Sequence, residues 1–217
     1  MKCTFKYDLI SILVLLIILT YSLIIVIGLF YAYFKYGLDA VRILSALVFP
    51  DRTVIDNRTL LEVVNYELGL HLLLVGYEVL RGYVWELLTA LFIHANIAHL
   101  ILNIIALLIV RSISTALNVK NASILKVFLT SGITGNLVTA FSMPYIASLG
   151  ASGGIFGIFS YLALKEYKEM GSLTLPTIVL IILLISSLPL VGYPNIISHL
   201  IGVCIGVMIY EIEVMRT

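Results

Sequence analysis

Long uninterrupted apolar runs dominate the hydrophobic pattern of this chain. The first run extends from about residue 9 to residue 34, follows Lys2 and Lys6, and ends in aromatic residues before Lys35. A signal peptide has a shorter apolar centre and a small-residue cleavage site after it. A run of this length instead predicts a retained helix that crosses a membrane.

Five further apolar segments follow in the second half of the chain. Turn-forming residues, among them Pro144, Gly171 and Gly192, separate most of them. The fourth and sixth of the six predicted helices are short for a full crossing. The pattern favours an all-α polytopic membrane protein built as a six-helix bundle. The predicted helices cover residues 9–34, 97–117, 122–141, 152–167, 173–190 and 196–210.

The stretch from residue 36 to residue 95 has a mixed pattern and holds most of the acidic residues. Its apolar segments, Leu68–Val75 and Leu87–Ile93, are too short to span a membrane. We therefore predict a large loop that lies on the membrane surface and contains short interfacial helices. The whole chain, residues 1–217, is expected to form a single domain.

Composition agrees with a membrane protein. Of the 217 residues, 61% are hydrophobic and 12% are charged, whereas soluble domains are near one half and one quarter. The net charge of +1 gives no indication of a nucleic-acid partner. Cys3 and Cys204 stand at opposite ends of the chain, so no disulfide framework is expected.

The loops that carry Lys and Arg predict the orientation. The short loops at 143–150 and 191–195 contain neither residue, so we place them outside, and both termini then lie in the cytoplasm of a multi-pass cell-membrane protein. The predicted inner side holds Lys2, Lys6, Arg111, Lys120, Lys126, Lys165, Lys168 and Arg216.

Four polar residues on three predicted helices fall at a similar depth in the outer half of the membrane. Ser152 and His199 lie at or near the starts of two helices, and His99 and Asn103 lie in the first turns of a third. Polar groups inside a membrane are costly unless they are partnered or line a cavity. Each residue alone has an ordinary explanation, such as a helix cap for Ser152. Their common depth instead indicates a functional site.

Small residues would allow the two helices of Ser152 and His199 to approach closely. Gly202 and Gly206 share a helical face with His199. Phe156 shares a face with Ser152, so its ring is expected to pack against the imidazole. Glycines leave the first turns of the Ser152 helix nearly bare; they are Gly153, Gly154 and Gly157.

This arrangement favours nucleophilic catalysis. His199 is the candidate base that would activate the Ser152 hydroxyl. The unpaired N–H groups at the start of the helix, with His99 and Asn103 as further donors, could hold an oxyanion. Acidic residues after Glu86 all lie on the predicted cytoplasmic side. We therefore expect a Ser-His dyad without a third, acidic member and without a cofactor.

Other readings of these residues are weaker. The segment GASGG at 150–154 matches a nucleophile elbow, but that motif requires a preceding strand in a soluble fold. A metal site is disfavoured, because His94 and His99 point in different directions from a helix; His71 and His94 are expected to be interfacial. A small transporter with a polar midplane site is a further alternative, although no inverted repeat is visible.

The sequence resembles the rhomboid family of intramembrane serine proteases from about Trp85 to the C-terminus. The resemblance rests on three motifs and on the segment WELLTALFIHANIAHLILN at 85–103. The motifs are Gly150-Ala151-Ser152-Gly153, His99 with Asn103, and His199 with Gly202 and Gly206. The resemblance implies Ser152 as nucleophile, His199 as base, and His99, Asn103 and the Ser152 N–H as oxyanion donors.

The resemblance also implies that the partners are transmembrane protein substrates entering sideways from the lipid bilayer. From the charge and the histidine spacing, neither a nucleic acid nor a metal is expected as a partner. Two positions depart from the family's pattern: Glu86 replaces an arginine after Trp85, and Thr115 stands near the place of a glutamate. A rhomboid-like protein that binds transmembrane clients without cutting them is the main alternative function.

Overall fold

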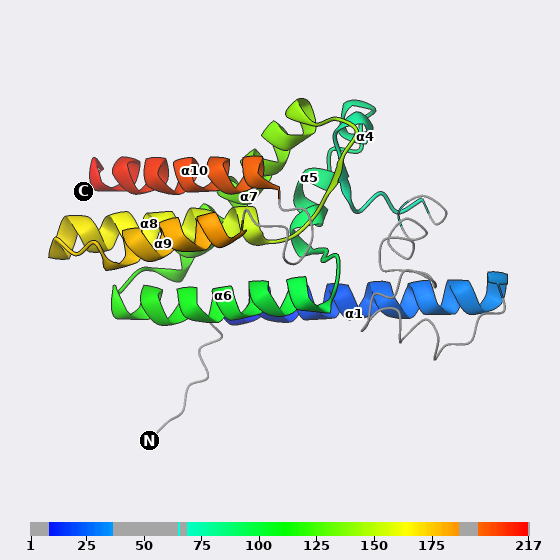
Figure 1. Ribbon diagram of the computed structural model, residues 1–217, viewed down its shortest axis with the longest axis horizontal. Helices are drawn as coiled ribbons and strands as arrows, with labels where there is room; N and C mark the ends of the chain where they lie inside the picture. Colours follow the sequence, from blue (N-terminus) through cyan, green and yellow to red (C-terminus); the bar gives the residue numbers. More distant parts are fainter. Residues whose placement is uncertain (1–8, 37–64, 66–68, 187–194, 217) are drawn as a thin grey trace, which may run out of the picture.

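The computed structural model describes residues 9–36, 65, 69–186 and 195–216. This part of the chain is mostly helical, and the helices lie side by side as a bundle of long rods (Figure 1). The long helices are α1 (Leu9–Tyr36), α6 (Ile97–Ala116), α7 (Asn121–Ser142), α8 (Ser152–Met170), α9 (Thr174–Ser186) and α10 (Ile196–Val214).

Each long helix starts within one residue of a predicted start. Four of them, α1, α6, α7 and α10, are long and apolar enough to cross a membrane. The described part of α9 has 13 residues, and α8 ends in a charged turn that includes Lys168. The six-span count therefore stays a prediction.

Helix α8 lies in the centre of the bundle and packs against α6, α7, α9 and α10. Its residues from Gly153 to Ala163 are all buried. A helix that is buried all round its circumference needs an apolar or small side chain at nearly every position. The first two turns of α8, which are rich in glycine, meet this need and bring neighbouring backbones close to Ser152.

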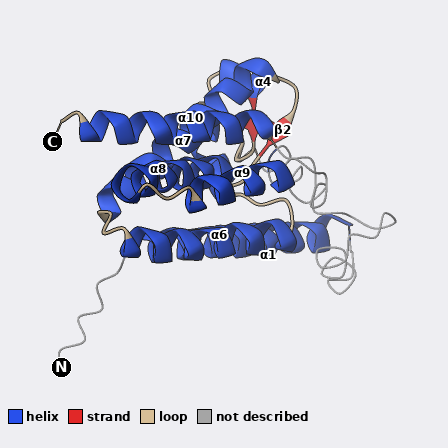
Figure 2. Cartoon of the chain, turned by 60° about the vertical axis from the view of Figure 1, so that its left-hand side comes forward, coloured by secondary structure: helices blue, strands red, loops and turns tan. Residues whose placement is uncertain are grey.

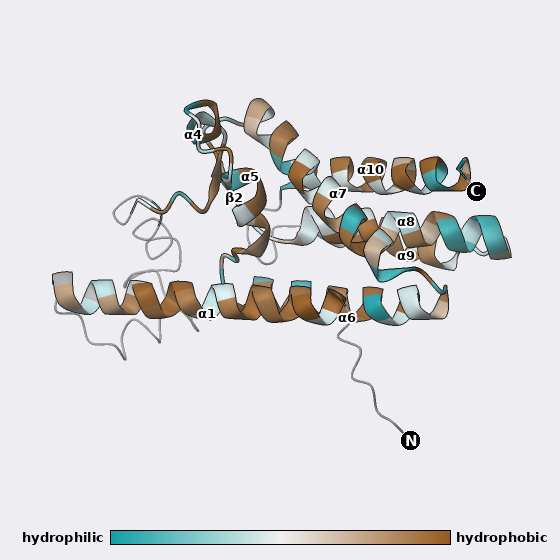
Figure 3. Ribbon diagram, turned by 180° about the vertical axis from the view of Figure 1, so that it is seen from behind, coloured by the Kyte–Doolittle hydropathy of each residue, from teal (hydrophilic) through white to brown (hydrophobic). Residues whose placement is uncertain are grey.

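The outer faces of the bundle are apolar, as a protein surrounded by lipid requires. Figure 3 shows hydrophobic residues along the lengths of α1 and α6. Side chains such as Leu19 and Leu23 on α1, and Ile101 and Leu102 on α6, are exposed rather than packed in the core. In a water-soluble protein, most large apolar side chains of this kind would be buried in the core.

The predicted surface loop is only partly visible. Residues 37–64 and 66–68, which make up much of it, lie outside the described residues. The rest contains short elements at one end of the bundle (Figure 2). These are β1 (Leu74–Val75), α4 (Gly76–Leu80), α5 (Glu86–Thr89) and the 3-10 helix η2 (Ala90–Phe92). Strand β1 pairs antiparallel with β2 (Ala147–Ser148), with Leu74 opposite Ser148.

Glu86 anchors this loop in place of the arginine that the resemblance leads one to expect. Its carboxylate is 0% exposed and accepts a hydrogen bond of 2.8 Å from the N–H of Val75. Trp85 and Thr89 add side-chain hydrogen bonds of 3.0 Å each to the carbonyl oxygens of His71 and Leu72. Glu86 therefore positions this loop through its Oε2 atom, without an arginine at this place.

Thr115, at the other departure from the family's pattern, makes a hydrogen bond within its own helix, donating to the carbonyl of Arg111 at 2.9 Å. At this end of the bundle Glu213 ties helices together. It accepts from the hydroxyl of Tyr161 on α8 at 2.8 Å and from the ammonium of Lys126 on α7 at 3.0 Å. A carboxylate from α10 thus supplies cross-helix bonds at this end.

Candidate active site

Ser152 and His199 lie side by side at the starts of two packed helices. Ser152 is the first residue of α8, and His199 lies in the first turn of α10. The Nε2 atom of His199 is 2.8 Å from the Oγ atom of Ser152, a normal hydrogen-bond distance. Both residues were candidates from the sequence, and the structure brings their reactive atoms together.

Phe156 packs on the imidazole of His199. The ring centroids are 4.5 Å apart and the planes are tilted by 36°. Phe156 is one turn after Ser152, so the serine and the aromatic ring meet the histidine from the same face of α8. A packed ring restricts the rotamers of the imidazole and so limits the positions that its Nε2 atom can take.

Glycines allow α8 and α10 to make this close contact. A side chain at Gly202 would overlap the carbonyl oxygen of Gly153, and one at Gly206 would overlap the carbonyl oxygen of Gly157. Gly154 differs from the sequence expectation. It faces Phe128 of α7, where an added Cβ would lie 2.6 Å from the ring. Its missing side chain therefore serves the α7 contact rather than the α10 contact.

Gly150 brings the segment before Ser152 against α6. Its φ is +116°, which residues with a side chain rarely adopt. An added Cβ would lie 2.7 Å from the Cε1 atom of the His99 ring. The N–H of Gly150 donates to the carbonyl of Ala90 at 2.8 Å. The structure thus places His99 beside the residue that lies two positions before Ser152.

Asn103 is buried one turn after His99 on α6. Its side-chain amide donates to the carbonyl of His99 at 2.9 Å. An asparagine NH2 group carries two hydrogens, so this bond uses only one of its donors. The N–H of His99 donates to Asn96 Oδ1, the cap of α6, at 2.8 Å. Both predicted oxyanion donors are thus held on the first turns of one helix.

His94 lies next to these residues and is buried, not interfacial as expected. It is 1% exposed, and its ring centroid is 5.1 Å from that of His99 in an edge-to-face arrangement. Burial and the neighbouring His99 lower the pKa of His94 to about 3, against a smaller opposite effect from the Phe92 backbone. His94 is therefore a neutral packing partner of His99 at physiological pH.

Sequence reasoning missed Asn195 and Ser148. Asn195 Oδ1 accepts the N–H of Ser198 at 3.0 Å and so caps α10. Its Nδ2 donates to Ser148 Oγ at 2.7 Å. The sequence signal for the cap was available, since asparagine is favoured just before a helix. The bond to Ser148 had no such signal, because it joins residues 47 positions apart.

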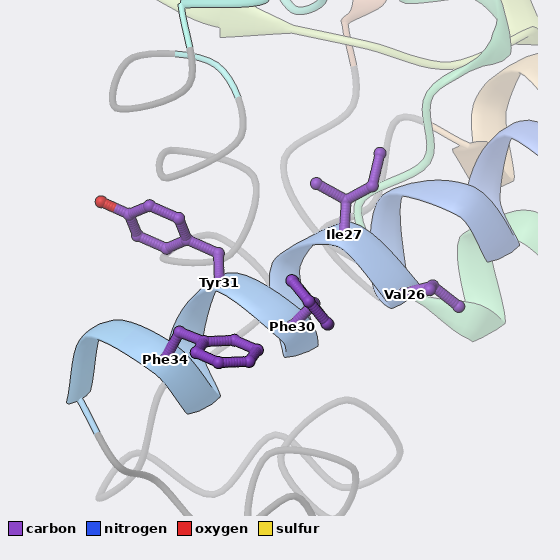
Figure 4. A pocket seen from close by; sticks show the side chains of 5 residues that line it. All are labelled: Val26, Ile27, Phe30, Tyr31 and Phe34. Atoms are coloured by element: carbon purple, nitrogen blue, oxygen red, sulfur yellow. The ribbon is translucent and has the colours of Figure 1, made fainter.

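Two observations concern a metal site and a cavity elsewhere in the described residues. In the described part of the chain, no group of three or more His, Cys, Asp or Glu residues could hold a metal ion. A cavity of about 330 Å³ lies along α1, and Figure 4 shows the residues that line it. All of them are apolar or aromatic residues of α1, so the cavity is separate from the Ser152 site: Val26, Ile27, Phe30, Tyr31 and Phe34.

Comparison with known proteins finds similarity to rhomboid proteins. The family model described as Rhomboid domain matches residues 81–216. Rhomboid protease GluP of Bacillus subtilis (strain 168) is 37% identical over 111 residues, covering 49% of this chain and 21% of GluP. Rhomboid-like protease 3 of Toxoplasma gondii is 35% identical over 79 residues, covering 36% of this chain and 30% of that protein.

An inactive relative is similar too. Inactive rhomboid protein 2 of Homo sapiens is 28% identical over 134 residues, which cover 58% of this chain and 15% of that protein. The chain thus spans less than a third of the length of each of these three relatives. Their names include both proteases and an inactive protein, so the site's own residues must decide between the two functions.

Proposed function

This chain belongs to the rhomboid family and is an integral membrane protein with several apolar helices, and we propose that it is a serine endopeptidase. It cleaves peptide bonds in or near transmembrane segments of other proteins. The observation that carries the proposal is the 2.8 Å distance between His199 Nε2 and Ser152 Oγ. This is the geometry that a nucleophile and its general base require.

In the proposed reaction these groups act in the following order. His199 takes the Ser152 proton while Oγ attacks the carbonyl carbon of the scissile bond. The charge that develops on the carbonyl oxygen is held by the N–H of Ser152 at the start of α8 and by the side chains of His99 and Asn103. His199 then gives its proton to the leaving amine. Water, activated by the same histidine, releases the acyl group from Ser152 and restores the hydroxyl.

The proposed location of the site within the membrane restricts the kind of substrate. An intact transmembrane helix hides its carbonyl groups in its own hydrogen bonds. A substrate must therefore unwind locally before it can present a carbonyl to Ser152. We propose that substrates enter sideways from the lipid, that the bundle has six membrane-spanning helices, and that both termini are cytoplasmic. The reaction requires no cofactor.

The alternative is a rhomboid-like protein that binds transmembrane clients without cutting them. The similarity to an inactive rhomboid protein favours it. The serine and histidine at hydrogen-bond distance favour catalysis instead. A purely client-binding protein gains nothing from a partly buried polar pair between two glycine-lined helices, because such groups cost free energy in a membrane.

A fluorophosphonate labelling experiment tests the proposal. The purified protein in detergent is treated with a fluorescent fluorophosphonate, beside Ser152→Ala and His199→Ala. Wild type should be labelled at Ser152, Ser152→Ala should not be labelled, and His199→Ala should be labelled far more slowly. Failure of wild type to be labelled, or equal labelling of all three, would exclude a Ser-His protease at this site.

A further inference from the structure

Asn195 joins three parts of the structure through one side chain. Its Oδ1 accepts from the N–H of Ser198 at 3.0 Å. Its Nδ2 donates to Ser148 Oγ at 2.7 Å and to Thr139 Oγ1 at 3.0 Å. The Thr139 hydroxyl in turn donates to the carbonyl of Gly135 at 2.9 Å. The amide thus uses both donor hydrogens and an acceptor, and it links α7, α10 and the segment before α8.

On the nucleophile side, Ser148 lies four residues before Ser152. It belongs to β2 and is paired with Leu74 of β1. Two residues later the N–H of Gly150 is bound to the carbonyl of Ala90. The segment that leads into α8 is therefore fixed at Ser148 and at Gly150, and Ser152 is held a short distance beyond both points.

On the base side, Asn195 is the cap residue of α10. Its main-chain carbonyl accepts the N–H of His199 at 3.2 Å, while its side chain accepts the N–H of Ser198. Helix termini fray unless their free N–H groups are satisfied. Asn195 therefore determines where the first turn of α10 begins and holds the backbone of His199.

A helix cap alone does not account for this residue. A cap needs only the acceptor oxygen, and serine or aspartate supplies it as well. The two further bonds reach Ser148 and Thr139, which are 8% and 2% exposed. Buried hydroxyl groups are costly to leave without a partner, so the donors of Asn195 bind the two elements together in one arrangement.

We propose that Asn195 is a positioning residue that sets the approach of His199 to Ser152. It does so by tying the segment before the nucleophile to the first turn of the helix that carries the base. The inference rests on the proposed function and adds to it a residue outside the catalytic machinery. A rigid link is needed there because the two helices otherwise meet through small residues, which do not by themselves fix how far one slides along the other.

The test uses Asn195→Ser, Ser148→Ala and the double variant in the full-length protein. Asn195→Ser keeps a capping oxygen but is too short to reach Ser148 as well, and Ser148→Ala breaks the same link from the other end. Asn121→Ser is the matched control, because Asn121 is an exposed asparagine in the first turn of α7. Cleavage of a model transmembrane substrate gives kcat and KM. The amplitude of fluorophosphonate labelling gives the fraction of protein that is active, and the rate of labelling gives the reactivity of each active site.

We expect kcat and the labelling rate to fall roughly 10- to 100-fold for Asn195→Ser, because small displacements of reacting groups have effects of this size. KM and the labelling amplitude should stay close to wild type. Ser148→Ala should behave similarly, and the double variant should be no worse than the poorer single variant, since both remove one link. Asn121→Ser should match wild type.

A purely structural role gives a different result. It lowers the labelling amplitude and the thermal stability together and leaves the rate of the surviving fraction unchanged. Three outcomes would overturn the inference while leaving the proposed protease intact. They are this combined loss of amplitude and stability, a wild-type kcat for Asn195→Ser, and additive losses in the double variant. If Asn195→Ser does not fold, Ser148→Ala decides the question by the same readouts. A wild-type protein that neither labels nor cleaves overturns the proposed function and the inference with it.

Discussion

The carbonyl oxygen of Gly153 on α8 lies against Gly202 on α10 and occupies the space that a side chain at Gly202 would need. Gly153 follows Ser152, the proposed nucleophile, and Gly202 lies one turn after His199, the proposed base. A contact between two backbones therefore limits how closely α8 and α10 approach each other beside the proposed catalytic residues.

Gly202→Val should reduce activity far more than stability. The new side chain must push α10 away from α8, and overpacking of this kind costs about 1–3 kcal/mol of stability. A displacement near 1 Å at the reacting groups lowers the rate by roughly a hundredfold. Thermal unfolding in detergent and the cleavage rate, measured on the same preparation, separate the two effects.

Leu200→Val is the control for Gly202→Val, since Leu200 is an exposed residue of the same helix. It introduces the same β-branched residue at an exposed position and should keep nearly wild-type activity. A Gly202→Val protein as active as wild type would show that the glycine contact does not set the Ser152–His199 geometry.

His99→Ala and Asn103→Ala should each lower kcat by roughly a hundredfold with little change in KM. Groups that bind the oxyanion act mainly in the transition state, so their removal affects turnover rather than substrate binding. Steady-state kinetics with a transmembrane substrate gives both constants. A rise in KM alone would identify the residue as a substrate contact and remove it from the oxyanion site.

Stability should depend on pH through Glu86. Burial, with a smaller contribution from Glu78, raises the pKa of Glu86 from 4.5 to about 7, despite the opposing hydrogen bond from Val75. His71 Nδ1 also faces the carboxyl at 3.7 Å. The folded protein thus keeps a proton that the unfolded chain releases near pH 4.5. Stability should fall as pH rises from about 4.5 to 7 and then level off.

Glu86→Gln tests this dependence, because glutamine cannot ionise but can still accept a hydrogen bond from Val75. At about 1.4 kcal/mol per pKa unit, the fall in wild type amounts to roughly 3 kcal/mol and should be absent in the variant. Unfolding temperatures are compared at pH 5 and pH 8. An equal decline in both proteins would assign the pH dependence to other groups.

The proposed orientation is tested by single cysteines in a background that lacks Cys3 and Cys204. Ile146 and Met170 are both exposed, and they flank α8 at its opposite ends. In intact cells, Ile146→Cys should react with an impermeant thiol reagent from outside, and Met170→Cys should react only after the membrane is opened. The reverse pattern would invert the proposed topology.

The helix starts could be predicted from the sequence because polar or turn-forming residues precede the apolar runs. The proximity of Ser152 and His199 could also be anticipated, since both begin helices that enter from the same side and carry glycine faces. These are local features. Spacing along the chain and the cost of burying polar groups were enough to find them.

The remaining features depend on partners that are distant in the sequence. Nothing near Glu86 indicates that its carboxylate meets the N–H of Val75, and nothing near Asn195 indicates Ser148. His94 is buried and Gly154 faces α7 because of the way in which whole helices pack. A pattern of residues along the chain does not determine that packing. Long-range hydrogen bonds of this kind become visible only once the helices are placed.

Cleavage of a transmembrane substrate by wild type and by Ser152→Ala is the sharpest test of Ser152 as the nucleophile. The change removes one hydroxyl group and should leave the thermal unfolding of the protein unaltered. Both proteins are reconstituted with the same fluorescently labelled substrate, and the fragments are separated and quantified. If Ser152 is the nucleophile, wild type cleaves the substrate and Ser152→Ala gives no fragments above background. Substantial cleavage by the variant would contradict this role of Ser152, because the nucleophile would then lie elsewhere.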